Sequence, residues 1–166
     1  MGNSTNLLNK AAVLEALPEH PAVKAILAWN PEALTDARWE HGELTLTVAA
    51  GAIRQIAEAM RAAGYNFFED MTAVDWFPAA PRFQLSYHLL SHSFKEYIRL
   101  RLFLLGDDPS VASITPVWPA ANYYEREVFD LFGIAFEGHP NLKRILMPDD
   151  WQGHPLRKDY PVEGYR

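Results

Sequence analysis

Two stretches of alternating residues in the middle of the chain constrain its fold more than any other feature. Apolar side chains fill every second position from Phe83 to Leu89 and again from Ile98 to Leu104, and most residues between them are polar. A period of two directs these side chains to one face of an extended strand. A short polar turn at 91–93 joins the two stretches. The pattern predicts an antiparallel hairpin with one buried face.

Helical and extended patterns surround this hairpin. Periodicity and turn residues predict helices at 11–17, 21–29, 52–63 and 122–132, a second hairpin at 38–48 that turns at His41-Gly42, and a β-rich segment at 66–77. Antiparallel hairpins with helices on one side predict an α+β fold, a two-layer domain with a mainly antiparallel sheet. We place this domain at residues 1–132 and an extended, irregular C-terminal tail at residues 133–166.

The composition excludes several classes of function. The chain has no cysteine, so it forms no disulfide and offers no thiolate to zinc or to an iron–sulfur cluster. Its formal net charge is -6, and it has no basic stripe of the kind that binds nucleic acid. No run approaches the roughly 20 apolar residues that span a bilayer. The polar start from Met1 to Lys10 predicts no signal peptide. We therefore expect a cytoplasmic protein that reaches a membrane only through partners.

The expected helix at 122–132 combines an apolar face with many charges. A helical wheel gives it two faces, an apolar arc of Tyr124, Val128, Leu131 and Phe132 and an opposite polar face of Arg126, Glu127 and Asp130. Arg126 and Asp130 are four residues apart, so we expect them to pair on the polar face.

Glu125 falls at the margin of the apolar arc, where a carboxylate is costly unless a cation or backbone donors satisfy it. Two interpretations remain open. Residues 125–127 form a solvated face, or Glu125 anchors an arginine of the tail or of a partner. Arg144 and Arg157 are the candidates in the tail, because a guanidinium binds a carboxylate through two hydrogen bonds.

The tail is long and irregular but rich in apolar residues. Residues 133–166 hold four glycines and four prolines, so regular structure is not expected over most of them. Disorder is disfavoured because many side chains need a surface to pack on, namely Phe136, Leu142, Ile145, Leu146, Met147, Trp151, Leu156, Tyr160 and Tyr165. We expect the tail both to wrap its own domain and to clasp another protein, with Arg144, Arg157 and Lys158 as charged anchors.

A metal site is the main chemical alternative for the tail. The ligand types of a two-histidine, one-carboxylate iron site are present in His139 and His154 with Asp149, Asp150 or Asp159. Each histidine lies in a Gly-His-Pro triplet, where the glycine and proline mark a turn and the imidazole can simply cap the backbone. The chain has neither a phosphate-binding loop nor a nucleophile elbow.

The last third of the chain resembles one family closely. The match begins with Glu125-Arg126-Glu127-x-x-Asp130-Leu131-Phe132, followed after six residues by His139 and after three more by Lys143-Arg144-Ile145-Leu146. It continues in Gly153-His154-Pro155-Leu156-Arg157-Lys158-Asp159-Tyr160-Pro161, and a weaker third segment is Asp70-Met71-Thr72-Ala73-Val74-Asp75. These segments resemble the C subunit of respiratory complex I, the 30-kDa subunit family of proton-pumping NADH–quinone oxidoreductases.

The resemblance implies a structural subunit of the peripheral arm, on the cytoplasmic face of the inner membrane, with no catalytic residue and no cofactor of its own. It implies contact with the quinone-site D subunit, of the 49-kDa type, and with neighbouring iron–sulfur subunits. The complex would use FMN, iron–sulfur clusters, NADH and quinone. The signature residues become candidate partner contacts: Glu125, Arg126, Glu127, Asp130, His139, Arg144, His154, Arg157, Lys158 and Asp159. Because the chain stops five residues after Pro161, we expect the separate form rather than the form fused to the 49-kDa partner.

Two other assignments stay open. Related subunits occur in complexes fed by ferredoxin or coenzyme F420 and in membrane hydrogenases, so this chain alone does not decide the electron donor. The other assignment is a free-standing metalloenzyme that uses His139, His154 and an aspartate.

Overall fold

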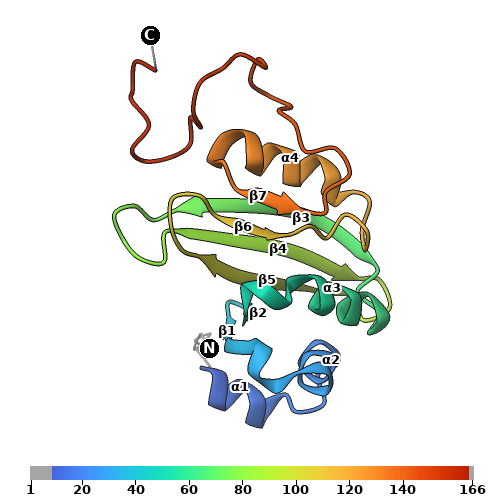
Figure 1. The fold of residues 1–166 in the computed structure, drawn as a ribbon. Helices are drawn as coiled ribbons and strands as arrows, with labels where there is room; N and C mark the ends of the chain where they lie inside the picture. Colours follow the sequence, from blue (N-terminus) through green and yellow to red (C-terminus); the bar gives the residue numbers. More distant parts are fainter. Residues whose placement is uncertain (1–8, 165–166) are drawn as a thin grey trace.

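The computed structural model describes residues 9–164, which form a mixed sheet, helices beside it and a long irregular C-terminal segment (Figure 1). The chain begins with α1 (Lys10–Ala16), α2 (Pro21–Trp29) and the short 3-10 helix η1 (Pro31–Ala33). The main sheet contains β1 (Leu34–Glu40), β2 (Glu43–Val48), β3 (Phe67–Asp75), β4 (Phe83–Ser91) and β5 (Glu96–Leu104). The other elements are η2 (Ala50–Ala52), α3 (Ile53–Ala62), β6 (Ser110–Ala112), α4 (Ala121–Phe132) and β7 (Ala135–Glu137).

The order of the five strands is β1-β2-β5-β4-β3, so the β4–β5 hairpin lies beside the β1–β2 hairpin. All neighbours are antiparallel except β2 and β5, which pair in parallel with Leu46 opposite Leu100. In the β4–β5 hairpin Leu85 lies opposite Leu102, and both side chains are buried. The predicted antiparallel hairpin and its single buried face are confirmed.

The turn between β1 and β2 falls at the predicted dipeptide. His41 and Gly42 have φ angles of 55° and 83°, as a two-residue hairpin turn with two left-handed residues requires. The strand itself begins at Leu34 rather than at the predicted Arg38. The pairing register shifts between Leu34 and Asp36, and this irregularity interrupts the alternation from which the start was predicted.

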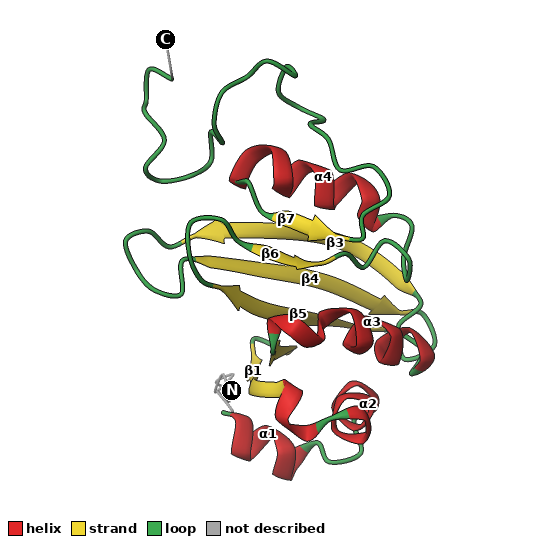
Figure 2. Ribbon diagram, viewed as in Figure 1, coloured by secondary structure: helices red, strands yellow, loops and turns green. Residues whose placement is uncertain are grey.

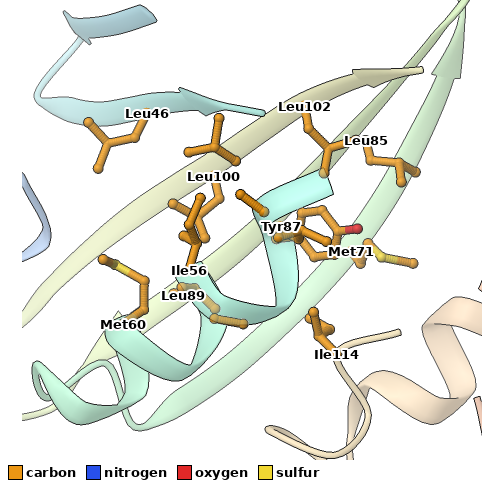
Figure 3. Close-up of a cluster of buried hydrophobic side chains, with 14 of the residues drawn as sticks. Leu46, Ile56, Met60, Met71, Leu85, Tyr87, Leu89, Leu100, Leu102 and Ile114 are labelled. Carbon is orange, nitrogen blue, oxygen red and sulfur yellow. The ribbon is translucent and has the colours of Figure 1, made fainter. Parts of the chain in front are cut away.

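Helix α3 lies across one face of the sheet and closes the core. Ile56 and Met60 of this helix face the buried leucines of the strands (Figure 3). Full burial of one such side chain stabilises the fold by about 1.5–3 kcal/mol. The opposite face of the sheet is polar and carries Arg99 and Arg101, because alternate residues of a strand point to opposite sides. The predicted two-layer α+β fold, with helices on one side of a mainly antiparallel sheet, is confirmed.

Helix α4 packs beside the edge strand β3. Tyr124 Oη donates to the carbonyl oxygen of Glu69 at 3.0 Å, and the Phe68 ring contacts the rings of Trp118 and Tyr124. Strand β7 follows α4 and pairs in parallel with β6, which buries Phe136. The first residues of the range 133–166 therefore pack as part of the body of the protein.

Beyond β7 the described chain, residues 138–164, contains no helix or strand (Figure 2). This segment runs past α4, at the end of the molecule away from α1 and α2 (Figure 1). None of the helices within residues 9–164 is long and apolar enough to cross a membrane.

Candidate functional site

Helix α4 buries two carboxylates. Glu125 and Asp130 both have 0% exposed surface. The burial of Asp130 corrects the sequence prediction, which placed this residue on an exposed polar face. A helical wheel describes only the helix itself, and in the structure the tail covers the face that the wheel assigned to solvent.

Asp130 organises the tail at residues 144–147. Its Oδ2 accepts three backbone hydrogen bonds, from the amides of Ile145, Leu146 and Met147 at 2.8–3.0 Å. The Arg144 guanidinium donates to Oδ1 at 2.5 Å. Burial alone raises the pKa of a carboxyl, but these donors outweigh it and hold the pKa of Asp130 below its ordinary value.

The expected pair of Arg126 with Asp130 does not form. Arg126 instead donates to the carbonyl oxygens of Lys143 and Arg144, at 3.2 and 3.0 Å. The reason is that the tail amides and Arg144 already enclose the Asp130 carboxylate. Arg126 and Arg144 together therefore hold the tail backbone in a bend over α4.

The tail also supplies the donors that the C-terminus of α4 lacks. The last carbonyls of a helix have no partner within it and attract positive charge. The last three carbonyls of α4 each accept a hydrogen bond from the tail. His154 Nδ1 donates to the Asp130 carbonyl at 2.9 Å, and the Leu156 amide donates to the Leu131 carbonyl at 3.0 Å. Arg157 Nε donates to the Phe132 carbonyl at 2.6 Å. Gly133 is the C-cap residue of α4, and residues 154–157 satisfy the remaining carbonyls of its last turn.

Gly133 allows the tail to approach this closely. Its φ is 72°, and a Cβ there would lie 2.5 Å from His154 Cδ2 and 2.7 Å from Arg157 Nη2. A larger residue would displace both side chains from the helix end. Burial lowers the pKa of His154, and its Nδ1 faces a carbonyl oxygen, so the neutral ring carries its proton on Nδ1.

A second tie joins the end of the tail to the sheet. Arg82 is 6% exposed and donates to both carboxylate oxygens of Asp75, at 3.0 and 2.9 Å. It also donates to Asp159 at 2.6 Å, and the Lys158 amide donates to Asp75 at 2.9 Å. The hydrogen bond from Arg82 holds the pKa of Asp159 below its ordinary value. Sequence reasoning missed Arg82 and Asp75 as site residues, and the available signal was the position of Asp75 at the end of the 70–75 segment.

Glu125 takes its hydrogen bonds from the body, and the tail approaches its carboxylate through His139 Nε2, at 4.0 Å. Its carboxylate accepts hydrogen bonds from one loop, from the Ser113 and Thr115 hydroxyls at 2.6 and 3.1 Å and the Ile114 amide at 2.7 Å. Of the two interpretations, the solvated face is wrong for Glu125, which is buried. The pairing with Arg144 or Arg157 is wrong as well, because both guanidinium groups lie at the other end of the helix. Burial raises the pKa of Glu125, and these donors only partly offset it.

His139 and His154 lie at opposite ends of α4. His139 Nε2 faces the Asn122 carbonyl at 3.2 Å, and its Nδ1 accepts from the Asn141 amide at 3.0 Å. His154 lies at Asp130, eight residues further along the helix, a rise of about 12 Å. Residues 9–164 contain no group of three or more side chains that could hold a metal ion. The iron site considered from the sequence is therefore not assembled by this fold.

The outer side of the tail differs from its inner side. Glu127 on α4 and Lys158 in the tail are exposed. Exposed apolar side chains accompany them along the tail, namely Ile145, Leu146, Trp151 and Leu156. An exposed apolar surface on a segment with no helix or strand is typical of a surface that a partner covers.

Comparison with known proteins gives one family. A family model described as "Respiratory-chain NADH dehydrogenase, 30 Kd subunit" matches residues 46–166. The chain is 45% identical over 148 residues to the C subunit of the NADH-quinone oxidoreductase of Roseiflexus castenholzii, and the match covers 87% of this chain and 85% of that protein. It is 48% identical over 133 residues to the C subunit of Citrifermentans bemidjiense, covering 80% and 83%.

Two solved structures share the fold. A chain of the membrane-bound sulfane sulfur reductase, an archaeal respiratory membrane complex, matches with a TM-score of 0.74 at 29% identity, covering 84% of both chains. The trypsin-resistant fragment 1–134 of Nqo5 matches with a TM-score of 0.57 at 33% identity, covering 61% of this chain and 83% of that one.

Proposed function

Because this chain belongs to the family of the 30-kDa subunit of respiratory-chain NADH dehydrogenase, we propose that it is a structural subunit of the peripheral arm of a proton-translocating NADH–quinone oxidoreductase. In such a complex electrons pass from NADH through FMN and iron–sulfur clusters to quinone, and this chain binds none of these groups. It lies on the cytoplasmic face of the inner membrane, which it reaches through its partners. Its role is to hold the D subunit, of the 49-kDa type, against neighbouring iron–sulfur subunits.

The observation that carries this proposal is that the tail binds its own domain with one side and exposes apolar residues on the other. Its inward groups, such as Arg144 and His154, bind the carboxylate and the carbonyls of α4. Its outward side exposes apolar residues, among them Leu146 at 60% and Leu156 at 48%. A segment that is already fixed on its own domain loses little conformational freedom when a partner covers it, and this favours tight association.

The description of the Nqo5 fragment bears on the protease sensitivity that we expect of the tail. That relative yields a trypsin-resistant fragment, which matches 61% of this chain. We propose that this fragment corresponds to the body of the present chain and that the tail owes its full protection from the protease to a partner. In this chain the tail offers trypsin the bonds after Lys143, Arg144, Arg157 and Lys158.

A second candidate is the same structural role in a related membrane complex with another electron donor. The match to a chain of the archaeal sulfane sulfur reductase covers 84% of this chain, so most of this fold occurs in a complex of different name. The electron donor of such a complex would bind to other subunits. The contacts of the tail with its own domain would be the same.

The test is purification of the tagged chain from its host membranes in mild detergent, with Leu146→Asp as the variant. Leu105→Asp is the matched control, because Leu105 is 73% exposed and lies outside the tail. We expect the wild type and the control to bring down the 49-kDa D subunit and an iron–sulfur assembly that reduces quinone with NADH, and Leu146→Asp to lose it. An assembly active only with another donor would select the second candidate. A lone chain with stoichiometric iron or zinc would contradict both.

A further inference from the structure

One buried hydroxyl of the core has no hydrogen-bond partner. Tyr87 on β4 is 1% exposed, and its Oη bonds to no group within residues 9–164. Trp118 Nε1 is the other buried side-chain atom of this kind in the part of the chain that the structure describes. Nearly all buried polar atoms of native proteins are paired, either with protein groups or with an ordered water molecule. Tyr87 therefore needs a partner that the described chain does not supply.

The Tyr87 hydroxyl is directed toward the side of the core on which α4 packs. Tyr87 lies opposite Met71 of β3, and its oxygen lies next to the Met71 side chain (Figure 3), while α4 packs on the same strand. Ile114 belongs to this buried cluster, and its backbone amide donates to Glu125 Oε1 on α4 at 2.7 Å. Burial raises the pKa of Tyr87, and the charge of Glu125 adds to this rise. The hydroxyl and the carboxylate therefore lie within electrostatic reach of each other but form no direct hydrogen bond.

The Glu125 carboxylate can accept one more hydrogen bond. Its Oε2 accepts from the Ser113 and Thr115 hydroxyls, whereas among the described residues Oε1 accepts only from the Ile114 amide. A carboxylate oxygen has two lone pairs, so Oε1 has room for a second donor. His139 Nε2 lies 4.0 Å from Oε2 and does not fill this place. A buried donor without an acceptor and a buried acceptor with a free lone pair therefore occupy the same region of the core.

The chemistry of these two groups suits a single water molecule. A water accepts from the Tyr87 hydroxyl and donates to the Glu125 carboxylate at the same time, and buried waters typically make about three hydrogen bonds to polar groups that are otherwise unpaired. Tyr87 and Glu125 are 1% and 0% exposed, so the site does not open to a larger ligand. A metal ion is disfavoured because the groups around the carboxylate are two hydroxyls and an amide that donate to it.

We infer that one internal water molecule binds between Tyr87 Oη and Glu125 Oε1 and joins β4 to α4. The water gives the tyrosine its missing acceptor and gives the carboxylate a fourth donor. Such a bridge is nearly as favourable as a direct hydrogen bond. It ties a strand in the interior of the sheet to the helix that carries the tail. The inference does not rest on the proposed function, because both groups belong to the body of this chain.

A crystal structure of the full chain at high resolution tests the site directly. We expect an ordered water about 2.7–3.0 Å from both Tyr87 Oη and Glu125 Oε1. A direct hydrogen bond between the two side chains would overturn the inference. A well-ordered Tyr87 ring without a water at its hydroxyl would overturn it as well.

A matched pair of variants tests the same bridge in solution. Tyr87→Phe removes the hydroxyl, and Tyr65→Phe is the reference, because Tyr65 is also fully buried and its hydroxyl donates directly to Glu96. We expect Tyr87→Phe, like the reference, to raise the equilibrium constant of urea unfolding about three- to tenfold. It should also raise the pKa of Glu125, followed by carbon-13 NMR, because the carboxylate loses a donor. Tyr65→Phe should leave that pKa unchanged.

The opposite sign would identify a hydroxyl that is simply unpaired. Removal of an unpaired buried hydroxyl stabilises a protein, so a Tyr87→Phe variant at least as stable as the wild type overturns the inference. An unchanged pKa of Glu125 in this variant overturns it as well. If Tyr87→Phe does not fold, the crystal structure of the wild type decides by the presence or absence of the bridging water.

Discussion

The two ends of α4 hold their buried carboxylates in opposite ways. Glu125 and Asp130 lie five residues apart without exposed surface, yet the pKa of Glu125 is raised and the pKa of Asp130 is lowered. Burial acts in the same direction on both. The difference lies in the donors, because Asp130 has three amides and a guanidinium, whereas Glu125 has one amide and two hydroxyls.

These donors come from different parts of the chain. Those of Glu125 belong to the loop at 113–115, before α4, and those of Asp130 belong to the tail at 144–147, after it. The N-terminal half of α4, with Glu125, therefore contributes to the stability of the body. The C-terminal end, with Asp130, holds the tail. Substitutions at the two positions should separate these roles.

Asp130→Ala should give the largest effect, and the effect should be confined to the tail. Removing one partner of a buried pair costs about 3–5 kcal/mol, and here the tail can release its unpaired donors to water by detaching. We expect trypsin to cleave after Lys143 and Arg144 at least about tenfold faster, while the sheet keeps its far-ultraviolet circular dichroism. Asp149→Ala, an exposed neighbour in the tail, is the control. Unchanged cleavage would contradict the role of Asp130.

Glu125→Ala should act on the body instead. It leaves the Ile114 amide buried without an acceptor and creates a cavity, so we expect the free energy of unfolding to fall by about 2–4 kcal/mol. Urea denaturation measures this loss. Glu127→Ala, an exposed change in the same helix, should stay within about 0.5 kcal/mol of the wild type. A variant whose only defect is faster cleavage of the tail would remove the distinction between the two ends.

Arg144→Lys should have an intermediate effect, of about 1–3 kcal/mol on the docking of the tail. A guanidinium reaches Asp130 and the carbonyls of Trp151 and Gly153 together, and an ammonium cannot make all of these contacts. Hydrogen exchange at the amides of residues 145–147 measures the loss. Protection equal to that of the wild type would mean that charge alone holds this bend.

The smallest effect should be a pH dependence of opposite sign at the two carboxylates. The folded pKa of Glu125 lies above its unfolded value of about 4.3, so its ionisation lowers stability as the pH rises from there through the folded pKa. Glu125→Gln should therefore gain stability relative to the wild type across that window. Asp130 has a lowered pKa, so its contribution is complete above about 3.9 and is lost as the pH falls through the folded value. Urea unfolding from about pH 4 to 8 would refute this if the Glu125→Gln difference were constant.

The elements that could be predicted from the sequence are those whose own residues show a clear period. Alternation located β4 and β5, and the helical period located α3, because each of these elements packs one face on the common core. The burial of Asp130 was not predictable from its own helix, because it depends on amides about 15 residues further along the chain.

The contacts of the site were harder to predict than its residues. The odd position of Glu125 was visible on the wheel, but its donors are two hydroxyls and an amide of an irregular loop, which carry no periodic pattern. Arg82 was missed for a similar reason. A single arginine after a proline-rich turn gives no sign that it binds Asp75 and, through the fold, Asp159 at the far end of the chain.

The central place of β5 has a consequence for how the protein is made. Synthesis proceeds from the N-terminus, so β1 and β2 leave the ribosome well before residues 96–104, which supply the strand that pairs with β2. Until then the inner edge of β2 has unpaired amides and carbonyls, and such edges pair readily with neighbouring chains. The nascent first half cannot close its sheet alone, and the whole body completes its sheet only after β5 has been translated.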